Sequence, residues 1–158
     1  MIKVLFVCLG NICRSPMAEG VFKKQVEDAD LTDQIECDSA GIIGYHAGEL
    51  PDKRMRRTAS SHGITLTHHS RQLSPADFEK FDYILGMDEN NMKAIRQMEK
   101  SVTNKKAKVF KMREFDEQES SKDVEDPYYQ GDDGFEICYQ VLRTSTQNFL
   151  DFIVEENS

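Results

Sequence analysis

Short apolar runs alternate with segments of helical pattern along this chain, and this alternation constrains the fold more than any other feature. The runs have the length and the β-branched content of buried strands. We expect strands at Ile2–Val7, Ile35–Ala40, Tyr83–Met87 and Lys108–Met112. Strands separated by helices predict a parallel sheet with helices on both faces. We therefore expect an α/β fold, a three-layer, doubly wound sheet of four parallel strands, as one domain over residues 1–158.

The segments between these runs carry the signals of helices. We expect helical segments from Met17 to about Asp28, from Pro51 to His62, from Pro75 to Lys80, after Asp88, and from Asp133 or Gly134 onward. Gly63 would stop the second segment and Asp88 would cap the fourth. In the last segment apolar side chains recur at spacings of three and four, so that one long face should be buried. The charged stretch Glu114–Glu125 lacks an apolar period and is expected to be a loop.

Charge and composition exclude several classes of protein. The formal net charge is −8, from 20 basic and 28 acidic residues, which argues against nucleic acid as the main partner. No apolar run has the length of a membrane span, and the first residues do not match a signal peptide. Four cysteines are too few for a disulfide framework, so we expect a cytoplasmic protein with reduced thiols. Two basic runs, residues 53–57 and 105–108, are expected to be solvated faces that could steer an anionic substrate.

The segment that follows the first strand has the pattern of an anion site. Cys8 ends the strand, Arg14 comes six positions later, and Ser15-Pro16 is expected to open a helix with Ser15 as its N-cap. Backbone N–H groups and the helix dipole favour a bound anion at such a junction. A cysteine beside this loop and a guanidinium should be a thiolate at neutral pH. A thiolate in a phosphate-binding loop predicts nucleophilic phosphoryl transfer.

Other interpretations of this segment fit the sequence less well. Cys8 and Cys13 could be half of a zinc site, but Cys37 and Cys138 form no second pair and the four histidines lack zinc spacing. A purely structural Cys8 would not explain the arginine that follows it. A dinucleotide-binding loop would need more glycines than Gly10 alone.

Cleavage of a phosphomonoester also needs an acid that protonates the leaving oxygen. Asp126 is the best candidate, because it follows a polar loop, precedes the last helix and is stiffened by Pro127. An Asp-Pro pair is also common in simple turns, so composition alone leaves this role open.

With these segments in view, the chain resembles the low-molecular-weight protein tyrosine phosphatases. The segment Cys8–Ser15 is similar to the signature loop of that family, and Asp126-Pro127-Tyr128-Tyr129 is similar to its general-acid loop. Further matches follow in order over nearly the whole chain: residues 38–41, 68–73 and 81–88.

The resemblance implies a role for each matched residue. Cys8 would attack phosphorus and form a phosphocysteine, Arg14 would bind the phosphate, and Asp126 would act as general acid and then as general base. The remaining residues of the implied phosphate-binding loop are Leu9, Gly10, Asn11, Ile12, Cys13 and Ser15, with Ser39 and His68 as supports in a hydrogen-bond network. Asn11 would take a left-handed backbone. The chemistry would need no metal and no cofactor.

The resemblance also indicates a substrate. Tyr45, Tyr128 and Tyr129 would form the walls around a phosphotyrosine ring, with Tyr45 at a position where tryptophan is commoner. The partners would be phosphotyrosine proteins, with inorganic phosphate as product and without nucleic acid or membrane. Two alternatives share the fold: a phosphoarginine phosphatase, which would carry threonine at Ile12, and a thiol-dependent arsenate reductase, which would need cysteines near residues 86–95.

Overall fold

A four-stranded parallel sheet forms the centre of the protein. The computed structural model describes residues 1–117, 122–131 and 133–158, apart from the side chain of Tyr129. The strand order is β2-β1-β3-β4, and every pairing is parallel. The strands are β1 (Ile2–Cys8), β2 (Ile35–Gly41), β3 (Tyr83–Gly86) and β4 (Lys108–Lys111). The four predicted parallel strands are therefore confirmed, although β1 and β2 each extend one residue further than expected and β3 and β4 each end one residue earlier.

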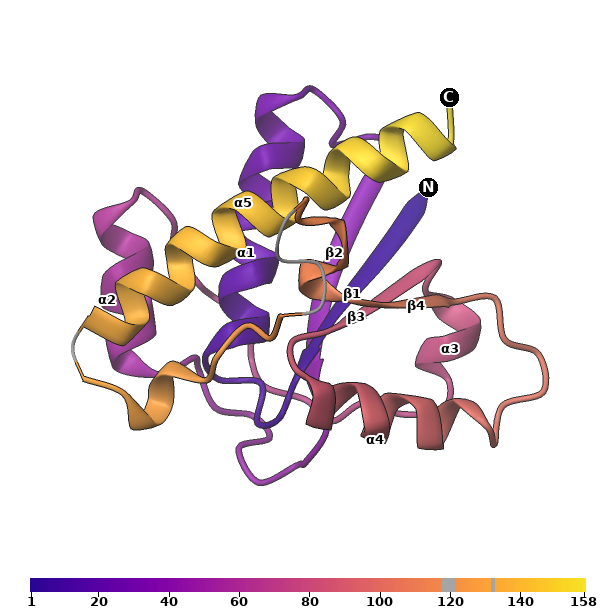
Figure 1. The fold of residues 1–158 in the computed structure, drawn as a ribbon, viewed down its shortest axis with the longest axis horizontal. Helices are drawn as coiled ribbons and strands as arrows, with labels where there is room; N and C mark the ends of the chain where they lie inside the picture. Colours follow the sequence, from indigo (N-terminus) through magenta and orange to yellow (C-terminus); the bar gives the residue numbers. More distant parts are fainter. Residues whose placement is uncertain (118–121, 132) are drawn as a thin grey trace.

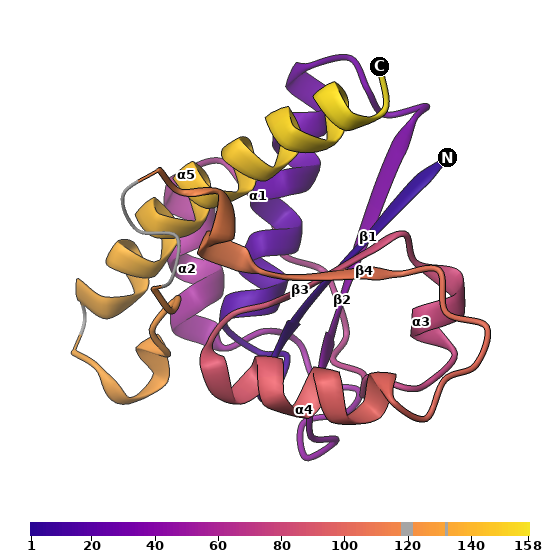
Figure 2. The ribbon, with the colours of Figure 1, turned by 45° about the vertical axis from the view of Figure 1, so that its right-hand side comes forward.

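Helices cover both faces of the sheet (Figures 1 and 2). On one face α1 (Arg14–Asp28) packs against α5 (Asp133–Glu156), with α2 (Lys53–Ser61) beside α5. On the other face lie α3 (Asp77–Lys80) and α4 (Glu89–Glu99). Two separate hydrophobic clusters fill the spaces between the three layers, so the predicted three-layer architecture is confirmed.

The central strand β1 supplies both hydrophobic clusters. Its side chains alternate between the two faces of the sheet. Val4 and Phe6 belong to the cluster under α1 and α5, whereas Leu5 and Val7 belong to the cluster under α4. All four are completely buried. This two-sided burial explains why the strand is a continuous apolar run rather than an alternating one.

The start of α1 differs from the prediction. The helix begins at Arg14 with Cys13 as N-cap, and no side chain caps it. Ser15 therefore lies inside the first turn, and the predicted N-cap at Ser15 is wrong. The physical reason is that the Ser15 hydroxyl has other partners, the Cys8 thiol and the Asn11 amide. Because the helix begins earlier than predicted, Arg14 occupies its first position.

The remaining helix boundaries follow the predicted signals closely. Asp52 caps α2 by accepting from the Arg54 backbone N–H, and Gly63 beyond the helix has a φ of 77°. Asp88 caps α4 by accepting from the Asn91 backbone N–H at 2.7 Å.

The stretch that was expected to be a loop contains a short helical turn. Its first two residues belong to the 3₁₀ turn η1 (Met112–Phe115), and residues 118–121 lie outside the described part of the chain. A second 3₁₀ turn, η2 (Pro127–Tyr129), precedes α5. None of the helices in the described ranges has the length and apolar character needed to cross a bilayer.

Candidate active site

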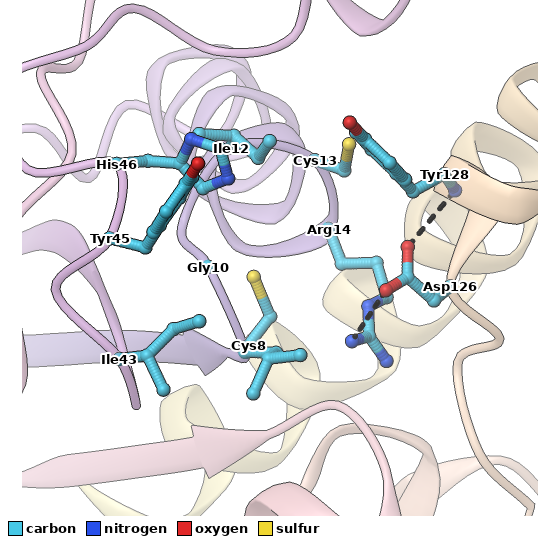
Figure 3. Close-up of a pocket in the computed structure, with 11 residues that line it drawn as sticks. Cys8, Gly10, Ile12, Cys13, Arg14, Ile43, Tyr45, His46, Asp126 and Tyr128 are labelled. Carbon is cyan, nitrogen blue, oxygen red and sulfur yellow. Dashed lines mark hydrogen bonds and ion pairs between the residues drawn. The ribbon is translucent and has the colours of Figure 1, made fainter.

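A cavity of about 280 Å³ opens at the carboxyl end of β1. Open parallel sheets bind ligands at this edge. Three segments line the cavity: the loop after β1, the loop after β2 and the segment before α5 (Figure 3). The lining residues are Cys8, Leu9, Gly10, Ile12, Cys13, Arg14, Ile43, Tyr45, His46, Asp126 and Tyr128. Most of the predicted site residues, from regions far apart in sequence, therefore surround one space.

Asn11 holds the loop from its centre. Its backbone φ is 58°, the left-handed conformation that was predicted for it. Its side-chain amide donates to the hydroxyls of Ser15 at 2.8 Å and Ser39 at 3.0 Å. Its carbonyl oxygen accepts from His68 Nε2 at 2.8 Å and from the Arg71 backbone N–H at 3.0 Å. The implied hydrogen-bond network of Asn11, Ser15, Ser39 and His68 is present, and it uses every polar atom of the buried Asn11 amide group.

The Ser15 hydroxyl connects this network to Cys8. The Ser15 oxygen lies 3.0 Å from Cys8 Sγ and accepts from the Asn11 amide. Because the amide supplies the proton of that second bond, the hydroxyl proton of Ser15 can go to the sulfur at 3.0 Å or to the Ala40 carbonyl at 3.5 Å, and the sulfur is the nearer acceptor. A donor in this position stabilises a thiolate more than a thiol.

Three ionisable groups at the back of the network could also suggest a metal site. The ligand atoms of Glu19, Asp38 and His68 lie within 4.8 Å of one another. Glu19 accepts from the Ser39 hydroxyl at 2.6 Å, and His68 Nδ1 lies 3.3 Å from both carboxylates. The protein's own donors already occupy these carboxylate oxygens, so the cluster is best explained as the outer support of the loop.

Arg14 is a buried cation held in a fixed direction. Its side chain is 2% exposed, and its guanidinium donates to Asp88 at 2.6 Å and to the Val124 carbonyl at 2.9 Å. A third contact, at 3.5 Å, joins it to Asp126. Burial alone would lower the pKa of Arg14, but Cys8, Asp88 and Asp126 outweigh that effect and raise it. The guanidinium is therefore a permanent positive charge beside Cys8.

Asp126 lies beside this cation, on the side of the cavity that Tyr128 also lines (Figure 3). Its Oδ1 accepts from the Tyr128 backbone N–H at 3.0 Å, and its Oδ2 is the oxygen nearest Arg14. The segment is fixed to the sheet by the Val124 backbone N–H, which donates to the Met87 carbonyl at 2.7 Å. One carboxylate is thereby held over the site while it stays 30% exposed to solvent.

Aromatic and aliphatic side chains form the walls. Tyr45 is 82% exposed and Tyr128 is 41% exposed. Tyr45 packs edge-to-face on His46, with 4.8 Å between ring centroids. Figure 3 shows Tyr45 and His46 on one side of the cavity and Tyr128 on the other. The side chain of Tyr129, the third predicted wall residue, lies outside the described part of the structure.

Sequence reasoning missed three residues of this site: Asp88, His46 and Ile43. Asp88 was predicted only as the cap of a helix, yet its second oxygen holds Arg14. The signal was present, since Asp88 follows a strand that ends at the same edge of the sheet as Cys8. His46 lines the cavity and contacts Glu49 at 2.9 Å. Only its position next to Tyr45 could have indicated this.

Taken together, a parallel three-layer sheet and a cysteine–arginine loop with a facing carboxylate define a cysteine-dependent phosphoryl-transfer enzyme. Residues 3–158 match the family model described as low molecular weight phosphotyrosine protein phosphatase. The chain belongs to this family.

Individual relatives agree with this assignment. A protein of that name from Schizosaccharomyces pombe is 46% identical over 150 residues, which cover 94% of this chain and 95% of the relative. The crystal structure of a protein tyrosine phosphatase from Entamoeba histolytica is 39% identical and superposes with a TM-score of 0.91, covering 100% of both chains. A Drosophila arginine phosphatase is also similar, at 35% identity and a TM-score of 0.89, covering 96% of this chain and 98% of its own.

Proposed function

We propose that this protein hydrolyses the phosphate monoester of phosphotyrosine in protein substrates and releases inorganic phosphate. One observation carries the proposal. Cys8 Sγ lies in a cavity that also contains the Arg14 guanidinium and the Asp126 carboxylate, between walls formed by Tyr45 and Tyr128. The cation would bind the phosphate, and the aromatic walls would hold a phenyl ring.

In the first step the Cys8 thiolate attacks phosphorus and the bond from phosphorus to the tyrosyl oxygen breaks. The loop N–H groups and Arg14 stabilise the charge on the equatorial oxygens. Asp126, in its protonated form, gives its proton to the leaving phenolate. Ser15 stabilises Cys8 as a thiolate before the attack. The products are tyrosine and a phosphocysteine.

In the second step water attacks the phosphocysteine. Asp126, now ionised, takes a proton from that water, and the Cys8 thiolate is the leaving group. Phosphate is released and the enzyme returns to its starting state. The position of Asp126 suits both roles, since its carboxylate is fixed by Tyr128 N–H and is open to solvent.

The positions of the other thiols give little support to a relay of the arsenate-reductase kind. All four cysteines, each within the described residues, are free thiols. Cys37 donates to the Glu19 carbonyl, and Cys138 is buried in the core. Burial raises the pKa of both groups.

A nucleophilic thiol must stay reduced, and for this reason we also place the enzyme in the cytoplasm.

Two substitutions test the chemistry. Cys8→Ser should still bind phosphate-like anions but lose essentially all turnover, because an alcohol stays protonated. Asp126→Ala should slow hydrolysis of phenyl phosphate by roughly 10²–10⁴-fold, the usual contribution of a positioned general acid. Its effect should be smaller on para-nitrophenyl phosphate, whose leaving group needs less protonation. Appreciable turnover by Cys8→Ser, or equal losses across leaving groups for Asp126→Ala, would contradict these roles.

A panel of peptides tests the substrate class. Matched peptides carrying phosphotyrosine, phosphoserine or phosphoarginine should be hydrolysed with a clear preference for phosphotyrosine, since only that residue places an aromatic ring between Tyr45 and Tyr128. A preference for phosphoarginine would instead assign the protein to the activity in the name of its Drosophila neighbour.

A further inference from the structure

A run of basic side chains at the start of α2 lies beside the cavity, and the catalytic chemistry does not use it. The run consists of Lys53, Arg54, Arg56 and Arg57. The chain as a whole carries a formal charge of −8. The local positive charge beside the phosphate site is therefore opposite in sign to the net charge of the protein, and it needs its own explanation.

Two contacts place the first turn of α2 at the rim of the cavity. The Asp52 backbone N–H donates to the Ile12 carbonyl at 2.7 Å, and Ile12 lines the cavity. The Arg54 guanidinium lies over the ring of Tyr128, 5.2 Å from its centroid, and Tyr128 lines the cavity as well. Lys53 stands between these two anchored residues and is therefore at the rim.

Two of the four cations are already engaged. Arg54 pairs with Asp52 at 3.0 Å, and Arg56 donates to a backbone carbonyl of its own segment at 2.9 Å. Lys53 and Arg57 are exposed, and among the residues that the structure describes neither has a hydrogen-bond or ion-pair partner. They are four positions apart in one helix, so their side chains share a face and extend about 6 Å along it.

We propose that Lys53 and Arg57 form a subsite for acidic side chains that flank the phosphotyrosine of a protein substrate. The proposal rests on the proposed function and narrows its substrate class. An extended peptide advances about 3.3 Å per residue, so residues two or three positions from the phosphotyrosine lie roughly 7–10 Å from it. The start of α2 is held at the rim through Asp52 and Arg54, so such flanking residues would pass along this helix. Carboxylates there would meet two unpaired cations.

The test compares two phosphotyrosine peptides that differ only in their flanks, one with Glu and Asp and the other with Gln and Asn. The wild-type enzyme should prefer the acidic peptide by roughly 3- to 10-fold in kcat/KM at low salt, a modest gain typical of exposed charge pairs. The preference should shrink as salt screens the charges. In the double variant Lys53→Glu/Arg57→Glu the preference should disappear or reverse.

A matched control separates a local effect from a change in net charge. The double variant Lys105→Glu/Lys106→Glu makes the same charge change before β4, at the amino edge of the parallel sheet and therefore away from the cavity. It should keep the wild-type preference for the acidic peptide. If both double variants lose the preference equally, or if the wild type shows none, the subsite is overturned.

A failure of the subsite can be told apart from a failure of the proposed function. Turnover of para-nitrophenyl phosphate that disappears in Cys8→Ser reports the phosphatase chemistry without any peptide flank. If this turnover is present and the peptide preference is absent, the subsite alone fails. If this turnover is absent, the function itself fails.

Discussion

Cys13 lies five residues after Cys8, the proposed nucleophile, in the same loop and is 4% exposed. Burial raises the pKa of its thiol, and the nearby charges of Asp52 and Cys8 raise it further. Cys13 is therefore a thiol where Cys8 is proposed to be a thiolate, and an oxidant would react with Cys8 first. A neighbouring thiol can then capture the oxidised sulfur as a disulfide.

We predict that peroxide forms a reversible disulfide between Cys8 and Cys13, and that this bond protects Cys8 from irreversible oxidation. The measurement treats wild type and Cys13→Ser with peroxide, then with reductant, and follows phosphatase activity. Wild type should recover most of its activity and Cys13→Ser clearly less. Equal recovery in both proteins would leave Cys13 with a packing role only.

For single residues, the sequence predicted the backbone conformation better than it predicted the hydrogen-bond partners of the side chains. The left-handed backbone of Asn11 followed from its residue type. Ser15 was misassigned because a serine before a proline fits a helix cap, and the signal for its real partner is seven residues away at Cys8. The sequence placed Asp88 at the same edge of the sheet as Cys8, but it did not show that Asp88 binds Arg14, because that contact joins positions 74 apart and depends on tertiary packing.

Among the elements, the segment that carries Asp126 depends on a polar clamp at its base. Asp123 accepts from Lys111 on β4 at 2.8 Å and from the Glu89 backbone N–H at the start of α4 at 3.0 Å. Burial opposes ionisation of Asp123, but its bond to Lys111 outweighs that effect and holds its pKa below the usual value. The clamp joins α4 and β4 to the backbone that positions Asp126, the proposed general acid.

We predict that Asp123→Ala lowers kcat on phenyl phosphate by roughly 3- to 10-fold, because a misplaced acid protonates the leaving group less well. The loss should be smaller on para-nitrophenyl phosphate, which a general loss of structure would not produce. Asp123→Asn keeps an oxygen acceptor and should recover part of the rate. Glu125→Gln is the matched control, since Glu125 is exposed in the same segment and contacts Gln130. Equal losses on the two substrates would rule out a positioning role.

For the whole molecule, several carboxyl groups have pKa values below their ordinary ones. These groups are Asp38, Asp52, Asp123, Glu136 and Glu156. For Asp38, burial would raise the pKa, but bonds from His68 and the Ser39 N–H and the charge of Arg71 lower it. A carboxyl group whose pKa is lower in the folded than in the unfolded protein stabilises the fold at pH values above its unfolded-state pKa. That contribution is lost as the pH falls through the folded value.

We predict that the thermal midpoint of unfolding falls as the pH is lowered below about 4, and that Asp38→Asn shows a smaller fall than wild type. The reason is that the asparagine amide does not titrate in this pH range. The variant therefore lacks the loss of stability that protonation of Asp38 causes in wild type. Thermal scans between about pH 7 and pH 3 measure both curves. Parallel curves would mean that Asp38 has the same pKa in the folded and unfolded chain.

The architecture followed from the sequence, but the order of the strands did not. Alternating strands and helices predict a parallel sheet through general rules of chain connection. Periodicity does not say which strands are neighbours, and the order β2-β1-β3-β4 places β3 directly beside β1. Because β3 lies beside β1, Asp88 after β3 comes close to Arg14 after β1. The contact between Asp88 and Arg14 was therefore missed for the same reason as the strand order.

The position of Arg14 in the first turn of α1 gives the two halves of the site different mechanical character. The phosphate loop continues without a hinge into a helix whose Met17 and Phe22 are completely buried in the main core. Opening the loop would therefore disturb a helix that is packed into the main core, and such packing resists local opening. Asp126, the proposed general acid, instead precedes a three-residue 3₁₀ turn. The phosphate-binding loop is thus fixed by the core, whereas Asp126 is held by a short local turn. The segment with Asp126 could then adjust to leaving groups of different shape while the phosphate-binding loop keeps its geometry.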